Sequence, residues 1–212
     1  MALDPKTKET VREEALRLSK EFAALDGRRP RVLLIEMEND LESDREERKL
    51  AANALADSGW DVDVSPSQQP EDAAKGAADN DVHFVFYTTT GDARGKNAVA
   101  LSRALALYGR DDILIAVHQV SPEEKESLFR YGILCAFSKD YDYLQASLTM
   151  LRILIAREKQ EMEEDDAYKG VTGIGRKRTE ISREDVSSFT MNGIIRFPPV
   201  GNAIKLRKSL AT

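Results

Sequence analysis

The sequence predicts an α/β fold built on a doubly wound, five-stranded parallel sheet, and three observations support this prediction. Short apolar runs recur between residues 31 and 137, each with the length of a buried strand. Segments with helical spacing of apolar residues alternate with these runs. The first run is continuously apolar, as expected for a parallel strand covered on both faces. Alternating strands and helices favour right-handed crossovers and a flavodoxin-like strand order.

The expected strands are 31–35, 61–64, 82–87, 113–117 and 133–137. A helix is expected over residues 7–25, where one apolar stripe contains Val11, Ala15, Leu18, Phe22 and Leu25. The helix expected over 44–58 has an inner face of Leu50, Ala51, Ala54 and Leu55. Further helices are expected from Pro70, over 97–108 with Tyr108 at least partly inward, from Ser121, and from Asp142 into the 150s.

Composition places the chain among soluble proteins, because 42% of its 212 residues are apolar and 32% are charged. Its longest apolar runs are too short to span a bilayer, and its N-terminus lacks the apolar core of an export signal. The single cysteine, Cys135, cannot form an intrachain disulfide and is expected as a buried thiol. These features predict a cytoplasmic protein.

Charge divides the chain into two parts. The net charge is −6, but residues from Tyr168 onward carry nine basic and three acidic side chains. We therefore expect an N-terminal helix (1–27), an α/β domain (28–156), a charged linker (157–169) and an extended basic C-terminal arm (170–212). The charged stretch after Ile155 is either a frayed helix end or a linker. The N-terminal helix either packs on its own domain or docks on a partner.

The C-terminal arm combines cations with scattered apolar residues and is less polar than a typical disordered linker. It is expected to dock on a partner or on its own domain, with disorder in isolation as the alternative. The residues expected to make such contacts are Arg176, Lys177, Arg178, Phe189, Ile195 and Phe197.

Ligands of doubly wound folds bind at the carboxyl ends of the strands, where this chain has several polar loops. Acidic residues follow the first strand, and an alternative use for them is to bind a cation. A receiver domain of a response regulator needs an aspartate at the end of the third strand, but Tyr87 and Thr88 stand there. Residues 90–96 lack P-loop spacing. Two distant histidines and one cysteine do not form a zinc motif.

The motifs of the chain are similar to the cobalamin-binding domain of methylmalonyl-CoA mutase and related acyl-CoA mutases. The resemblance extends from about Leu16 to Leu154, and it is carried by GRRPRVLLIEM, ALADSGWDVDVSP, PEDAAKGAADNDVHFV, YGRDDILIAV and SPEEKESLFRYGILCAF. In that family a histidine in a D-x-H-x-x-G motif coordinates the cobalt. A Ser-rich turn, a Gly-Gly pair and a Gly-rich turn line the slot for the buried nucleotide arm of the cofactor. Glycine is needed where a side chain would occupy the slot or forbid the backbone conformation.

This chain departs from the family pattern in all four loops. In the register that begins at Asp40, Glu42 replaces the histidine and Arg45 replaces the last glycine; an alternative register at Asp44 supplies no histidine either. Thr88-Thr89-Thr90 stands in place of the Ser-rich turn, and His118-Gln119 stands in place of the Gly-Gly pair. The Gly-rich turn is replaced by Ser138-Lys139-Asp140-Tyr141. A carboxylate is a poor substitute for imidazole, and His118 and Gln119 are expected to fill the slot.

The resemblance therefore implies a scaffold with a degenerate cofactor site. We expect no bound cofactor and no catalysis by the chain on its own, because the mutase barrel that holds the substrate has no counterpart in these residues. The expected role is a structural or regulatory subunit that docks to a larger partner, such as a mutase barrel subunit, or to further copies of itself. Binding to nucleic acid or to a membrane is not expected.

Two alternatives stay open. One is a working cobalamin-binding small subunit of an adenosylcobalamin-dependent acyl-CoA mutase, and the other is a sensor of a small ligand or phosphate. If the edge holds a cofactor, the expected contacts are Asp40, Glu42, Thr88, Thr89, Thr90, His118, Gln119 and Ser138. His118 is either a ligand donor or, as we favour, a filler of the slot, whereas His83 is expected to be structural.

Overall fold

Parallel strands form the centre of the protein, as the sequence predicted. The computed structural model describes residues 4–37, 44–88, 94–133 and 135–172, with the backbone alone for residue 67 and residues 164–172. The strands are β1 (Arg31–Met37), β2 (Asp61–Gln68), β3 (Phe84–Thr88), β4 (Leu114–His118) and β5 (Cys135–Ala136). All neighbouring strands pair in parallel in the order β2-β1-β3-β4-β5, which confirms the flavodoxin-like arrangement.

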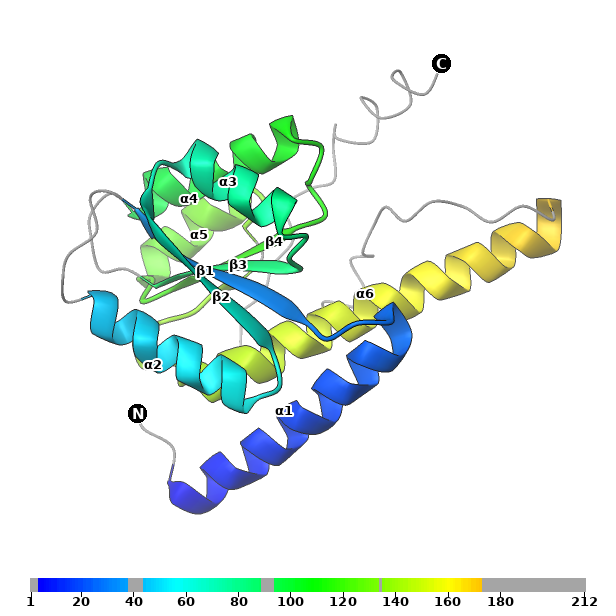
Figure 1. Cartoon of the computed structure of the whole chain (residues 1–212), viewed down its shortest axis with the longest axis horizontal. Helices are drawn as coiled ribbons and strands as arrows, with labels where there is room; N and C mark the ends of the chain where they lie inside the picture. The colour runs from blue at the N-terminus through cyan, green and yellow to red at the C-terminus, as the bar shows by residue number, and fades with distance from the viewer. Residues whose placement is uncertain (1–3, 38–43, 89–93, 134, 173–212) are drawn as a thin grey trace.

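Helices cover both faces of the sheet (Figure 1). They are α1 (Pro5–Asp26), α2 (Asp44–Asp57), α3 (Pro70–Asp79), α4 (Arg94–Leu107), α5 (Pro122–Arg130) and α6 (Tyr143–Thr172). Buried side chains from α1, α2 and α6 form one core with one face of the sheet, and those from α3, α4 and α5 form a second core with the other face. Alternate residues of each strand supply the two cores, because successive strand side chains point to opposite faces.

The N-terminal helix packs within its own domain, which is one of the two alternatives left open by the sequence. Helix α1 lies alongside α6 (Figure 1), and its residues Ala15, Leu18 and Phe22 are buried in the same core as α6. Asp4 caps its first turn by accepting hydrogen bonds from the backbone N–H groups of Lys6 and Thr7, each at 3.1 Å.

Helix α6 corrects the prediction of a charged linker over residues 157–169. The helix instead continues unbroken to Thr172. Its charged residues have partners that the sequence pattern did not reveal: buried Arg157 donates to the carbonyl oxygen of Asp112 at 2.7 Å, and Lys159 pairs with Glu21 of α1 at 2.8 Å. The high charge of this segment, which suggested a linker, is therefore compatible with a helix because Asp112 and Glu21 of the domain provide partners for it.

Two predicted inward residues are exposed. The side chain of Leu50 is 56% exposed, because the buried stripe of α2 passes through Asp44, Arg48, Ala51 and Leu55. Tyr108 is 50% exposed at the end of α4. Strand bounds also differ from the prediction: β2 is longer at its C-terminal end, and β5 contains two residues.

Gly59 joins α2 to β2 at a point that admits no side chain. Its φ of +89° lies in the left-handed region, and an added Cβ would lie 2.7 Å from Ser19 Oγ. Ser19 in turn donates a hydrogen bond to the carbonyl oxygen of Gly59 at 2.8 Å. The turn thus fixes α1 against the α2–β2 connection, as expected for a glycine at a close approach.

Candidate functional site at the carboxyl edge

The carboxyl ends of the three central strands carry a row of polar residues under α2 and α6. Thr88 of β3 is in register with His118 of β4, and Ile35 of β1 is in register with Tyr87 of β3. The next position after Ile35 is Glu36, so Glu36, Thr88 and His118 occupy the last level of the sheet on one face. Polar residues at this edge are expected of a binding site in a doubly wound fold.

Glu36 is neutralised by arginines of α2. Its side chain is 14% exposed and forms an ion pair with Arg48, whose side chain is 8% exposed, while Arg45 lies 3.6 Å away. Arg48 Nη1 is buried and has no hydrogen-bond partner among the described residues. The pair takes two charges out of water at the start of α2, so each charge depends on the other.

His118 is buried beneath the edge instead of facing outward from it. It is 2% exposed, and its Nε2 lies 2.7 Å from the carbonyl oxygen of Tyr141. Since a carbonyl only accepts, Nε2 carries the proton, and Nδ1 is left as a buried acceptor without a partner among the described residues. Burial lowers the pKa of His118, so the ring is neutral at physiological pH.

Aromatic rings fill the space around His118. The ring of Tyr143, at the start of α6, lies 4.4 Å from the imidazole at an angle of 34°. Phe86 approaches both rings edge-on, with centroids 6.3 Å away. Phe137 is fully buried and stacks on Tyr141 at 5.1 Å. These residues, Phe86, His118, Phe137, Tyr141 and Tyr143, form a layer that we call the aromatic cluster.

The hydroxyl of Tyr143 connects the aromatic cluster to α2. It donates a hydrogen bond to Glu47 Oε2 at 2.6 Å. Burial, together with this carboxylate, raises the pKa of Tyr143, so the phenol stays protonated and remains a donor. The aromatic cluster is thereby closed on the side of α2.

Gln119 keeps a backbone conformation that favours glycine. Its φ is +64°, in the left-handed region, although it carries a full side chain. The sequence comparison placed Gln119 at the second glycine of the family's Gly-Gly pair. The turn after β4 thus has a glycine-type backbone at Gln119 and a buried side chain at His118.

The other predicted cofactor contacts have different outcomes. Thr88 is 1% exposed, and its Oγ1 has no hydrogen-bond partner among the described residues. Ser138 accepts a backbone hydrogen bond from Tyr141 at 3.0 Å within a turn. Asp40, Glu42, Thr89 and Thr90 lie outside the described residues, as do the predicted contacts of the arm: Arg176, Lys177, Arg178, Phe189, Ile195 and Phe197.

Arg48, Arg94 and Tyr143 contribute to this edge but were not predicted from the sequence. Arg94 begins α4 and pairs with Glu124 of α5 at 2.5 Å. Glu124 also closes the capping box of α5 with Ser121, a feature that the Ser-Pro-Glu-Glu motif did predict. Arg94 and Arg48 lie near the N-termini of their helices, where a cation interacts unfavourably with the helix dipole. That position was a sequence signal that each arginine pairs with a carboxylate.

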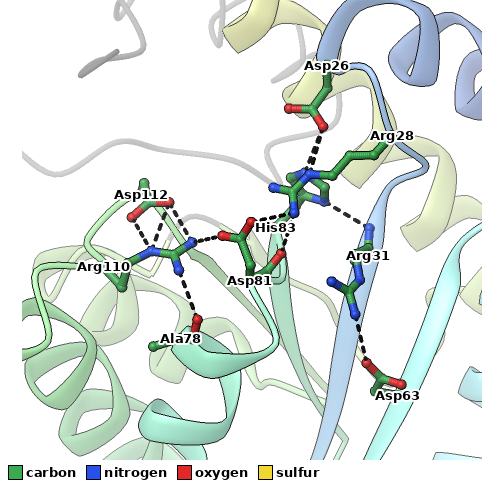
Figure 2. A network of polar contacts seen from close by, with 9 residues as sticks. All are labelled: Asp26, Arg28, Arg31, Asp63, Ala78, Asp81, His83, Arg110 and Asp112. Carbon is green, nitrogen blue, oxygen red and sulfur yellow. Dashed lines mark hydrogen bonds and ion pairs between the residues drawn. The ribbon is translucent and has the colours of Figure 1, made fainter. Parts of the chain in front are cut away.

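The amino edge of the sheet has a different construction (Figure 2). Asp81 pairs with Arg28 at 2.5 Å and with Arg110 at 2.7 Å, and Arg110 also pairs with Asp112 at 3.0 Å. His83 accepts a hydrogen bond from the backbone N–H of Arg31 at 2.9 Å. The charges at this edge are thus joined in one network.

His83 has the structural role that the sequence predicted. Besides accepting from Arg31, its ring lies edge-on to Phe22 at 4.9 Å, and its Nε2 is 3.5 Å from Asp26. Burial lowers its pKa to about 4, so the imidazole is neutral at physiological pH. Cys135 is also buried, as predicted, and burial raises the pKa of its thiol.

Both histidines of the chain are buried, and His118 is the one that lies at the carboxyl edge. His83 lies at the amino edge, and the Nε2 of His118 is used by Tyr141. Within the described ranges no group of three or more His, Cys, Asp or Glu side chains is arranged to hold a metal ion. Among the helices described, none has the length and apolarity needed to cross a membrane.

These features define the class of protein: a doubly wound α/β domain with buried aromatic side chains near the carboxyl edge of its sheet. No protein-family model matches the chain. Over 145 residues, or 68% of the chain, it is 39% identical to a probable methylmalonyl-CoA mutase large subunit of Mycobacterium bovis. Over 113 residues, or 53% of the chain, it is 44% identical to the methylmalonyl-CoA mutase large subunit of Propionibacterium freudenreichii subsp. shermanii.

The chain is therefore related in sequence to one segment of methylmalonyl-CoA mutase large subunits, which confirms the predicted resemblance. The matched segment is 19% of the Mycobacterium bovis subunit and 15% of the Propionibacterium subunit, so the chain spans less than a fifth of these relatives. Among solved structures, a cobalamin-binding protein from Desulfitobacterium hafniense matches with a TM-score of 0.47 and 13% identity, over 63% of this chain and 64% of that one. That level of similarity adds nothing about the site.

Proposed function

We propose that this chain is a cytoplasmic, non-catalytic subunit derived from the cobalamin-binding domain of an acyl-CoA mutase. In this role it does not bind cobalamin. It docks to a larger protein subunit, with a mutase barrel subunit as the first candidate. The domain then acts through its shape and its contacts.

The aromatic cluster is the observation that carries this proposal. His118 and Tyr143 lie 4.4 Å apart and are held by hydrogen bonds to Tyr141 and Glu47. A buried nucleotide arm would have to displace these rings and break both hydrogen bonds. Replacing a filled, hydrogen-bonded interior by a ligand is unfavourable unless the ligand restores the lost contacts.

The charges at the edge support the same conclusion. Glu36 and Arg48 form a buried pair with each other, so a charged ligand at this edge would compete with that pair. Neither histidine offers an exposed nitrogen to a metal at this edge. The described residues therefore do not fit cobalamin in the manner of the family, and no step of the mutase reaction is assigned to them.

Docking to a partner is supported by the charge distribution. The domain is acidic, whereas the arm from residue 170 onward is basic and carries apolar residues. Such a segment is suited to lie on an acidic surface with an apolar centre. The sequence relationship to mutase large subunits makes a mutase subunit the partner to test first.

A second candidate function is a cobalamin-binding subunit that lacks the histidine ligand. The observation in its favour is the identity of 39–44% to mutase large subunits across the domain. It requires the aromatic cluster to open, so it predicts that cobalamin binding is accompanied by loss of the Tyr143–Glu47 hydrogen bond.

Co-expression with the barrel subunit of a mutase from the same cells tests the docking proposal. We expect the two proteins to elute together in size-exclusion chromatography, and we expect removal of residues 170–212 to weaken the complex. Charge-neutralising changes at Arg176, Lys177 and Arg178 should also weaken it, while Arg130→Gln, at an exposed cation of the domain, should not. Separate elution of the full chain at micromolar concentrations would contradict the docking proposal.

A further inference from the structure

A groove of about 490 Å³ lies between α4 and α5, on the face of the sheet opposite the aromatic cluster. Its walls include Lys96, Val99 and Arg103 of α4, and Ser127, Leu128 and Tyr131 on the side of α5. The volume is within the range of about 300–1,000 Å³ that is typical of small-molecule sites. None of the residues predicted to contact a cofactor lines this groove.

The groove carries positive charge in an otherwise acidic domain. Lys96 and Arg103 are exposed, and neither forms an ion pair with another residue in the described part of the chain. Glu124 is the acidic residue in the lining, but it is engaged by Arg94 at 2.5 Å and by the backbone N–H of Ser121 at 2.9 Å. Two cations therefore face the groove without a local counter-charge, which favours an anionic ligand.

The same groove offers a surface for a flat ring. Tyr131 is 50% exposed, and the guanidinium carbon of Arg103 lies 5.9 Å from the centre of its ring. Val99 and Leu128 add apolar surface beside the cations. A tyrosine next to an arginine plane is a common surface for stacking of nucleobases.

We propose that the α4–α5 groove binds a nucleotide. The base stacks on Tyr131 against Val99 and Leu128, and the phosphates are bound by Lys96 and Arg103. An anion alone would leave the aromatic and apolar wall unused, and an apolar ligand would leave two cations without partners. This inference goes beyond the proposed function and does not depend on it, because the groove and the aromatic cluster lie on opposite faces of the sheet.

Titration of the full-length protein with ADP tests the proposal, with calorimetry for affinity and amide NMR shifts for location. We expect saturable binding, with the largest shifts at amides of α4 and α5. Arg103→Gln and Lys96→Gln should each weaken binding about tenfold, the size of one charge-assisted hydrogen bond. Tyr131→Leu should weaken it by a similar factor, whereas Lys49→Gln, which removes an exposed cation of α2, should leave it unchanged.

Two further probes separate the ring from the phosphates. Adenosine and inorganic pyrophosphate should each bind more weakly than ADP, because each uses one half of the site. The proposal is overturned if ADP does not bind at millimolar concentration, or if pyrophosphate binds as tightly as ADP. It is also overturned if the Arg103→Gln and Tyr131→Leu proteins, shown by circular dichroism to be folded, bind ADP like the wild type.

Discussion

The two edges of the sheet place polar residues in different environments. At the amino edge, Asp81 links Arg28 and Arg110, and the side chain of Asp81 is 53% exposed to solvent (Figure 2). At the carboxyl edge, Thr88 Oγ1 and His118 Nδ1 are buried atoms without partners among the described residues. The amino edge is a closed network near water, and the carboxyl edge is a packed interior with unused hydrogen-bonding groups.

This difference suggests what each edge was selected for. Unsatisfied buried polar atoms cost free energy, so they are uncommon where stability alone is at stake. Their presence at the edge that binds ligands in doubly wound folds supports the proposal that this edge no longer holds a cofactor. Among the described residues, the amino edge also has such atoms, but each lies near a carboxylate: His83 Nε2 is 3.5 Å from Asp26, and Arg157 Nε is 3.8 Å from Glu161.

Removing an aromatic ring from the carboxyl edge should have the largest effect on stability. Phe86 is 1% exposed and contacts the rings of His118, Phe137 and Tyr143. Phe86→Ala should lower the free energy of unfolding by about 3–5 kcal/mol, because it opens a cavity. Leu107→Ala, at a side chain that is 88% exposed, is the control and should change it by less than about 0.5 kcal/mol. If urea denaturation gave the same loss of unfolding free energy for Phe86→Ala and Leu107→Ala, the aromatic cluster would not stabilise the carboxyl edge.

Breaking the buried Glu36–Arg48 ion pair should cause the second-largest loss of stability. Glu36→Gln removes the carboxylate that pairs with buried Arg48 in the described part of the chain, so we expect a loss of about 3 kcal/mol. Glu126→Gln removes one carboxylate from the exposed pair with Arg130 and should cost less than about 1 kcal/mol. Denaturant unfolding of both variants measures the difference. A Glu36→Gln protein as stable as the Glu126→Gln protein would mean that water reaches Arg48.

The titration of His83 provides a test of the amino edge. Its pKa of about 4 in the folded protein lies below the ordinary value of 6.5, so the unfolded chain binds the proton first. Stability from this group is therefore complete above pH 6.5 and is lost as the pH falls toward 4, by about 3 kcal/mol. His83→Asn retains an acceptor for the Arg31 N–H and should flatten the decline between pH 7 and 5. An unchanged slope would assign that decline to other groups.

The smallest effect is expected at the exposed centre of the amino network. Asp81→Asn removes the carboxylate shared by Arg28 and Arg110, but solvent screens these pairs, so the loss should be about 0.5 kcal/mol. Asparagine tolerates the φ of +49° at this position, so the backbone should not contribute. Unfolding at low salt should show the loss, and 1 M NaCl should reduce it. A loss above about 2 kcal/mol would show that the network acts as a buried one.

Much of the fold could be predicted because hydrophobic periodicity depends on local sequence. The α5 capping box and the buried Cys135 follow from patterns within a few residues. The strand order was inferred from the alternation of strands and helices along the chain. The extent of α6 could not be predicted, because Arg157 and Lys159 are stabilised by Asp112 and Glu21, which are distant in sequence. The inner stripe of α2 was misplaced for a similar reason: Arg48 is buried by its pair with Glu36.

The placement of four candidate residues at one edge could be predicted, whereas their side-chain contacts could not. Sequence reasoning placed Thr88, His118, Gln119 and Ser138 at one edge of the sheet, and the structure has them at the ends of β3, β4 and β5. The role of Tyr143 was missed because it depends on the packing of α6 against His118 and Glu47. Tyr141 and Tyr143 closely follow β5, where the glycines of the related family are absent. Aromatic residues at such a position are a sequence signal that side chains fill the space.

Retention of cobalamin is the measurement that tests the central claim most directly. The full-length protein is mixed with hydroxocobalamin or adenosylcobalamin, dialysed, and its visible spectrum recorded beside that of a methylmalonyl-CoA mutase large subunit as a positive control. A carboxyl edge filled by the aromatic cluster predicts that this chain retains no pigment while the control does. Pigment retained in a one-to-one ratio with the chain would contradict the account and establish a cobalamin site that functions without the histidine ligand.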